Sequence, residues 1–333
     1  MPFSPYKSMF LSLILTGAIL SISATSWASA WIGLELNLMS FIPLISSKTN
    51  LLSSEATLKY FLIQALGSAV IIFSAAVSFM IPHFFLLTIS LALFLKMGSA
   101  PFHFWFPQIM EGLNWLHSTL LMTIQKLAPM FLVSYLTSDP LCLISISIVA
   151  ICSALIGAIS GLNQISLRKI LAFSSINHMS WMLFSMLVNE TTWSLYFLFY
   201  SLITTSLTIL FYTIQAFYLS DLMNFQSSLP LKVISMFSLF SLGGMPPFSG
   251  FIPKWIVAQE MITNSYFHTL TLLLFCSLIT LYFYLRLSIS ILSLTPPQNK
   301  CMKVWEPKSS FFFILGSFWN FFGIFAVTPF LLF

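Results

Sequence analysis

The sequence predicts an all-α polytopic membrane protein with about eleven transmembrane helices. Of its 333 residues, 58% are hydrophobic and only 6% are charged, and the mean hydropathy is +0.96. A soluble domain usually carries about a quarter charged residues, so this chain has too few to solvate a surface. Apolar runs of about twenty residues, the length that crosses a bilayer, recur from end to end.

The helices are predicted from these apolar runs and the short connections between them. They cover residues 7–24, 27–45, 56–80, 84–108, 113–136, 141–160, 167–188, 192–219, 231–264, 266–293 and 310–331. The longer connections, 46–55, 220–230 and 294–309, carry the Pro, Asn, Lys and Gln typical of loops. No polar insertion is long enough to fold separately, so we expect one transmembrane domain over residues 1–333.

The first, fourth and ninth predicted helices have features beyond an apolar run. The first, 7–24, shares one lysine and an apolar run with signal peptides, but the next helices follow at once and need it as a packing partner, so we expect it to be retained. The fourth, 84–108, and the ninth, 231–264, are long and contain glycine and proline. We expect both to be broken internally.

The positive charges predict the orientation. Basic residues gather on the side of the N-terminus, side A. The loops of the opposite side B hold no Lys or Arg, and their charged residues are Asp139, Glu190 and Glu260. Lys59 and Arg286 lie close enough to side A for their side chains to reach it. Basic residues in side A loops and helix ends are Lys7, Lys48, Arg168, Lys169, Lys232, Lys300, Lys303 and Lys308. The positive-inside rule places side A and the N-terminus in the matrix or cytoplasm, and the net charge of +5 gives no argument for nucleic acid.

Four charged residues remain near the middle of predicted spans: Glu35, Lys96, Lys126 and Lys254. A charge at mid-bilayer costs roughly 2.5 kcal/mol or more, so such residues usually face a polar interior and mark an ion path. Three lysines and one carboxylate cannot all be statically paired. Burial disfavours an ammonium charge and a nearby carboxylate favours it, so a lysine that alternates between these settings takes up and releases a proton. The alternative is that the four charges only fix helix packing.

Two of these spans have further polar features. Pro129, three residues after Lys126, removes a backbone hydrogen bond and loosens the local turn. His178 lies midway along 167–188 beside Ser174, Ser175 and Asn177. This cluster makes His178 a candidate proton relay, because histidine titrates near neutral pH; the alternative is a hydrogen-bonded packing residue.

The two long helices share an internal repeat. Residues 98–107 read GSAPFHFWFP and residues 244–253 read GMPPFSGFIP, and both fit G-x-x-P-F-x-x-x-x-P. Lys96 precedes the first motif and Lys254 follows the second. The two helices are five apart, so they cross in opposite directions, and interrupted helices at matching positions of inverted repeats point to a transporter's site. His103 inside the first motif either contributes to a hydrated interior or hydrogen-bonds a freed carbonyl.

The cysteines give no sign of a metal site or of a disulfide framework. Cys142, Cys152, Cys276 and Cys301 have neither CxxC nor metal-ligand spacing. Nucleotide, flavin and cluster motifs are also lacking in the sequence, so we expect no cofactor in this chain.

Several local strings resemble the antiporter-like membrane subunits of mitochondrial NADH:ubiquinone oxidoreductase, respiratory complex I. These strings are WIGLELNLMSFIPL (31–44), SSEATLKYFLIQA (53–65), LKMGSAPFHFWFPQIMEGL (95–113), QKLAP (125–129), LRKILAFSSINHMSW (167–181) and GGMPPFSGFIPKW (243–255). They extend over residues 31–255 in a specific order and spacing, whereas the first 25 residues and the tail after about 290 resemble the family only in being hydrophobic.

The resemblance implies roles for the buried charges. Glu35 and Lys96 match the family's coupled glutamate–lysine pair, Lys126 its central lysine and Lys254 the lysine of the second broken helix. The family's repeat is two inverted five-helix bundles; we assign the first to residues 56–188 and place the second repeat region at residues 192–293.

The resemblance also implies the setting. The chain would be a proton-translocating, non-redox subunit of the mitochondrial inner membrane, with its N-terminus in the matrix and its C-terminus towards the intermembrane space. Other membrane-arm subunits, neighbouring antiporter-like chains and phospholipids would be its partners, while NADH, FMN, iron–sulfur clusters and ubiquinone would bind elsewhere in the complex. A cation/proton antiporter subunit of a non-respiratory complex is the alternative.

Overall fold

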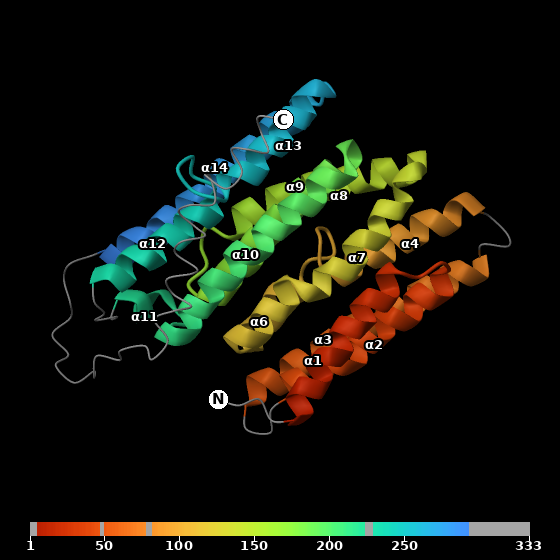
Figure 1. Ribbon diagram of the computed structural model, residues 1–333, viewed down its shortest axis with the longest axis horizontal. Helices are drawn as coiled ribbons and strands as arrows, with labels where there is room; N and C mark the ends of the chain where they lie inside the picture. The colour runs from red at the N-terminus through yellow and green to blue at the C-terminus, as the bar shows by residue number, and fades with distance from the viewer. Residues whose placement is uncertain (1–4, 47–49, 78–81, 224–228, 293–333) are drawn as a thin grey trace. The chain divides into compact units, whose positions relative to one another are not determined.

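The computed structural model describes residues 5–46, 50–77, 82–223 and 229–292, and these ranges are almost entirely helical (Figure 1). Within these ranges, one antiparallel bridge, between Ser166 and Tyr218, is the only pairing of the kind found between β-strands. The chain forms two compact units, Met1–Ser153 and Ala154–Phe333. Each unit is described separately below.

The first unit contains the N-terminal helices and part of α8. Its elements are α1 (Pro5–Ile22), α2 (Trp27–Ile45), α3 (Leu51–Val77), α4 (Pro82–Met97), α5 (Trp105–Gly112), α6 (Trp115–Met122), α7 (Ile124–Ser134), the short 3-10 helix η1 (Tyr135–Ser138) and α8 (Pro140–Ser160), which runs on into the second unit.

The second unit is built around α9. Its further helices are α9 (Leu167–Val188), α10 (Glu190–Ile214), α11 (Leu219–Met223), α12 (Leu229–Gly243), α13 (Phe251–Thr263) and α14 (Phe267–Leu292). In α9, 94% of the membrane-spanning window is buried within the protein. The polar side chains of α9 therefore face other parts of the protein, whichever side of the helix they occupy.

The helical membrane class is confirmed. Eight helices of the described ranges are long and apolar enough to cross a membrane. The count of eleven stays a prediction, because the helix expected at 310–331 and the loop at 294–309 lie outside the described residues. The loop expected over 46–55 was wrong in its second half, because α3 already begins at Leu51, where the Asn50 carbonyl accepts the first amides of the helix.

Both long helices are broken where the shared motif predicts, and the helix ends before the two breaks have the same turn geometry. The loops that follow differ, since among the described residues only the first holds a cis peptide bond, Ala100–Pro101. The preceding helix ends in each case at a glycine in the left-handed region, Gly98 (φ +70°) and Gly244 (φ +77°). The glycine amide bonds the carbonyl three residues back, that of Leu95 at 3.2 Å and that of Ser241 at 3.1 Å. The next amide bonds the carbonyl five residues back, that of Phe94 and that of Phe240, both at 3.2 Å. This is the Schellman arrangement, in which glycine takes the strained position.

The second half of each broken helix also starts at an equivalent place. After the loops 98–104 and 244–250, α5 begins at Trp105 and α13 begins at Phe251. The helix predicted at 113–136 is interrupted as well, at Thr123 (φ −112°, ψ −81°) between α6 and α7. The sequence had placed the loosened turn of this helix near Pro129, but Pro129 lies inside α7.

A chain of side-chain hydrogen bonds connects three helices of the first unit. Gln125 on α7 donates from Nε2 to Oδ1 of Asn37 on α2 at 2.9 Å, and its Oε1 accepts the Tyr60 hydroxyl of α3 at 3.1 Å. These polar groups are buried or half-buried between apolar surfaces, so each needs its partner. Gln125 therefore holds α2 and α3 against α7.

Two adjacent glycines, Gly243 at the end of α12 and Gly244 directly after it, provide a matched test of the turn geometry. We expect Gly244→Ala to destabilise the protein by about 1–2 kcal/mol, because an L-residue at its positive φ is strained, and because the new Cβ would lie 2.9 Å from Lys254 Nζ. Gly243→Ala should leave stability nearly unchanged, since its Cβ would meet Tyr284 at an ordinary 3.6 Å. Thermal unfolding midpoints of the two purified variants check this, and equal midpoints would contradict the assigned turn.

A second substitution tests the bridge at Gln125. Gln125→Leu leaves the Asn37 amide oxygen and the Tyr60 hydroxyl without this partner, so we expect a loss of about 1–3 kcal/mol of stability. The matched control is Gln108→Leu on α5, whose side chain is exposed. The bridge is refuted if thermal unfolding shows the same midpoint for both variants.

Candidate functional site

All three predicted mid-span lysines are buried. The exposed fraction is 6% for Lys96, 2% for Lys126 and 7% for Lys254. None of these side chains therefore reaches solvent at a membrane surface. By contrast, Lys59 is 40% exposed and forms an ion pair of 2.6 Å with Glu55, which agrees with its assignment to the surface.

Lys96 lies in the last turn of α4, directly before the first helix break. Its side chain crosses α3 at Gly67, where an added Cβ would lie 2.9 Å from Lys96 Cγ. Neutral donors satisfy the carbonyls of this helix end: Gln64 Nε2 bonds the Lys96 carbonyl and Trp105 Nε1 bonds the Leu95 carbonyl, both at 3.1 Å. The ammonium group of Lys96 is thus not used to cap its own helix.

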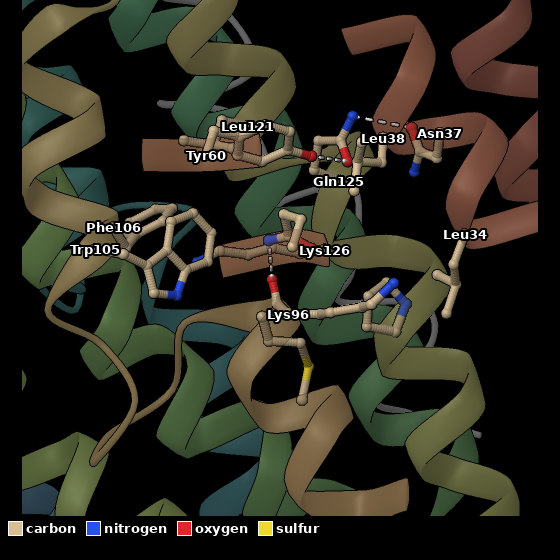
Figure 2. Close-up of a pocket in the computed structure, with 13 residues that line it drawn as sticks. Leu34, Asn37, Leu38, Tyr60, Lys96, Trp105, Phe106, Leu121, Gln125 and Lys126 are labelled. Carbon is tan, nitrogen blue, oxygen red and sulfur yellow. Dashed lines mark hydrogen bonds between the residues drawn. The ribbon is translucent and has the colours of Figure 1, made fainter. Parts of the chain in front are cut away.

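Lys126 lies in the first turn of α7, just after the interruption at Thr123. Its Nζ lies 4.5 Å from the centre of the Phe106 ring, a cation–π contact that is worth about 2 kcal/mol when desolvated. Lys96 and Lys126 line the same cavity of about 10 Å³, close to the minimum that holds one water molecule (Figure 2). Gln125, Tyr60 and the rings of α5 complete its wall.

Glu35 is half-buried on α2, close enough to Lys96 and to Tyr60 for electrostatic interaction. Its Oε2 is buried and has no hydrogen-bond partner among the described residues, and Glu35 makes no ion pair with Lys96 within 4 Å in that part of the chain. The glutamate is therefore near the lysine without being bound to it.

Lys254 is placed differently from Lys96. It lies in the first turn of α13, after the second break, and its Nζ donates to the carbonyl of Gly243 at the end of α12 at 3.0 Å. This carbonyl is one of the acceptors that a helix leaves unsatisfied at its C-terminus, where the helix dipole also favours a cation. The two helix ends thus share their turn geometry but not their capping group.

His178 is the predicted relay residue, and it lies at the centre of a polar cluster in the second unit. Its Nδ1 hydrogen-bonds the Tyr196 hydroxyl at 2.9 Å, and its ring packs on Tyr200 with centroids 5.2 Å apart. A cavity of about 10 Å³ connects these side chains with the break between α12 and α13. Its lining residues include His178, Tyr196, Tyr200, Ser241, Gly250 and Pro253.

His103 takes the second of its two predicted roles. Its Nδ1 pairs with the carbonyl of Pro101 at 3.2 Å inside the first break, and its ring lies 4.3 Å from that of Phe104. It therefore supports the loop backbone. The predicted surface residue Arg286 reaches the α8–α9 loop, where its Nη2 donates to the Gln164 carbonyl at 3.0 Å.

Several buried polar atoms beside these residues have no hydrogen-bond partner within the described ranges. They include Glu35 Oε2, Asn177 Oδ1 and Ser249 Oγ. Buried polar atoms without a protein partner are normally satisfied by internal water, because leaving them dry costs about 1–3 kcal/mol each. The arrangement thus fits the hydrated interior that the helix breaks predict.

The sequence reasoning missed the uncharged part of the site. Tyr60 and Gln125 in the first unit, and Tyr196, Tyr200 and Tyr284 in the second, stand in apolar runs where nothing in the spacing distinguishes them. A tyrosine or glutamine among leucines and phenylalanines is the only available signal. As for metals, no group of three or more His, Cys, Asp or Glu side chains in the described ranges could hold an ion.

Comparisons with known proteins identify the family of the chain. The family model described as NADH:quinone oxidoreductase/Mrp antiporter, TM, matches residues 24–83 and 79–280. A relative from Anopheles gambiae named NADH-ubiquinone oxidoreductase chain 2 is 43% identical over 92% of this chain and 90% of its own length. The protein of that name from Aedes aegypti is 41% identical over 89% of each chain.

A solved structure supports the fold. A chain of respiratory complex I from Thermus thermophilus superposes with a TM-score of 0.86 and 22% identity, over 99% of this chain and 81% of that one. The identity is too low to transfer more than the fold. Together with the family model and the relatives, it shows that the chain belongs to the NADH-ubiquinone oxidoreductase chain 2 family of antiporter-like membrane proteins.

Proposed function

We propose that this chain is a proton-translocating membrane-arm subunit of respiratory complex I. The observation that carries the proposal is the placement of buried lysines at both helix breaks, held by neutral groups. Lys254 is bonded to a backbone carbonyl, and Lys96 crosses a glycine with Glu35 nearby but unbonded. A buried lysine that only held helices together would be expected to have a fixed counter-ion, because an uncompensated buried charge is costly.

The proposed mechanism begins with a signal from quinone reduction elsewhere in the complex. This signal moves Glu35 towards or away from Lys96, which favours or disfavours the ammonium form of that lysine. Protons then pass through Lys126 and by way of His178 to Lys254 or out of the protein. The direction is from the matrix to the intermembrane space.

The chain's own contribution is proton transfer, and we assign it no electron transfer. Within NADH:ubiquinone reductase it would be a non-redox subunit, with NADH, FMN, iron–sulfur clusters and ubiquinone bound by partner subunits. Other membrane-arm subunits, including neighbouring antiporter-like chains, and phospholipids are its proposed partners. The relatives are named NADH-ubiquinone oxidoreductase chain 2, and we therefore assign the chain to the mitochondrial inner membrane as a multi-pass protein. The positive-inside rule supports an N-terminus in the matrix.

The repeat organisation is part of this proposal. Residues 56–188 and 192–293 would be two related units of one transmembrane domain spanning residues 1–333. The matching glycine turns at Gly98 and Gly244 support a common origin of the two breaks. A cation/proton antiporter subunit is the second candidate, because the matching family model also covers Mrp antiporters. Sodium-dependent exchange by the purified chain would favour that candidate.

Neutralising a buried lysine tests the proposal. We expect Lys254→Met and Lys96→Met each to lower the number of protons moved per electron pair, because methionine keeps the bulk of the side chain and cannot carry a proton. The measurement is proton uptake per NADH oxidised by the assembled complex in proteoliposomes.

Lys59→Met is the matched control, since Lys59 is partly exposed and paired with Glu55 at the surface. Its proton ratio should equal that of the unmodified complex. If both buried-lysine variants assemble and keep the unmodified ratio, the lysines only fix helix packing and the proposal fails.

A further inference from the structure

Three buried tyrosines surround His178 and the second helix break. Tyr196 and Tyr200 are one turn apart on α10 and so lie on the same face of that helix, while Tyr284 belongs to α14. Their exposed fractions are 1%, 2% and 1%. Each tyrosine also interacts electrostatically with at least one of the others, so the three hydroxyls share one neighbourhood.

The three hydroxyls are not equivalent. That of Tyr196 is engaged by His178 at 2.9 Å. Those of Tyr200 and Tyr284 interact with Ser175 and Ser174 on α9. Both serine hydroxyls donate to carbonyls of their own helix, at 2.7 and 2.9 Å, so each serine oxygen can only accept from its tyrosine. No donor to either tyrosine oxygen is found in the described part of the chain, so both oxygens keep a lone pair for a proton donor such as water.

Tyr200 lies beside His178, and Tyr284 lies beside the helix end that holds Lys254. The ring of Tyr200 packs on His178 and lines the cavity that extends to the break. The ring of Tyr284 lies against Gly243, 3.6 Å from where a Cβ would stand, and the carbonyl of Gly243 holds Lys254 Nζ. One tyrosine is thus beside the histidine and the other beside the lysine.

We propose that Tyr200 and Tyr284 are relay residues that pass protons between Lys254 and His178, together with water in the cavity. This inference rests on the proton translocation proposed above. A hydroxyl both donates and accepts a hydrogen bond. In each step a new O–H bond forms to the arriving proton while the O–H bond to the departing proton breaks, so every oxygen is neutral before and after the transfer. The ammonium of Lys254 loses the proton that the imidazole of His178 gains, or the reverse.

The test removes the two hydroxyls and keeps the rings. Tyr200→Phe, Tyr284→Phe and the double variant are compared with Tyr212→Phe and Tyr282→Phe, which alter partly exposed tyrosines on the same two helices (39% and 60% exposed). Lys254→Met is measured in parallel. The readouts are the yield of intact complex and the number of protons moved per electron pair in proteoliposomes.

We expect normal yield for all tyrosine variants, with the proton ratio of the double variant falling to that of Lys254→Met. If the double variant assembles poorly, the single variants are expected to fall below the two controls. Unmodified ratios in the relay variants beside a lowered ratio in Lys254→Met would overturn the relay role alone. Unmodified ratios in every variant, including Lys254→Met, would overturn the proposed function as well.

Discussion

The structure depends on one constraint: a polar group inside a bilayer must be satisfied by the protein itself or by water, because lipid offers no partner. Each broken helix frees a set of carbonyls at membrane depth. At the end of α4, Gln64 and Trp105 supply neutral donors, while at the end of α12 the ammonium of Lys254 does so. The same turn geometry is therefore stabilised in two different ways, and only the second way involves a proton-carrying group.

This difference gives the two units different chemistry. In the first unit, Lys96 and Lys126 line one small cavity with Glu35 near the first of them, so a movement of one carboxylate changes the balance of charge in that cavity. In the second unit, Lys254 donates to a backbone carbonyl, and His178, on the almost wholly buried α9, bonds a tyrosine hydroxyl of α10. Hydroxyl groups hold water and pass protons but do not bind them tightly.

The sequence predicted the elements that follow from local composition. The helices at 27–45 and 167–188 agree with α2 and α9 because each apolar run is long and is bounded by polar residues at both ends. The breaks were predictable because Gly98 and Gly244 stand in a repeated motif. The partners could not be predicted, because they come from distant parts of the chain: Gln125 bonds residues 65 and 88 positions away.

The central claim is that water occupies the polar interior beside the helix breaks and carries the protons. The most direct test is a high-resolution cryo-EM map of the assembled complex, in which ordered water is visible. The account predicts water within hydrogen-bond distance of Glu35 Oε2, Ser249 Oγ and the Tyr200 hydroxyl. Density showing these atoms dry, or bonded to protein groups that exclude water, would contradict it.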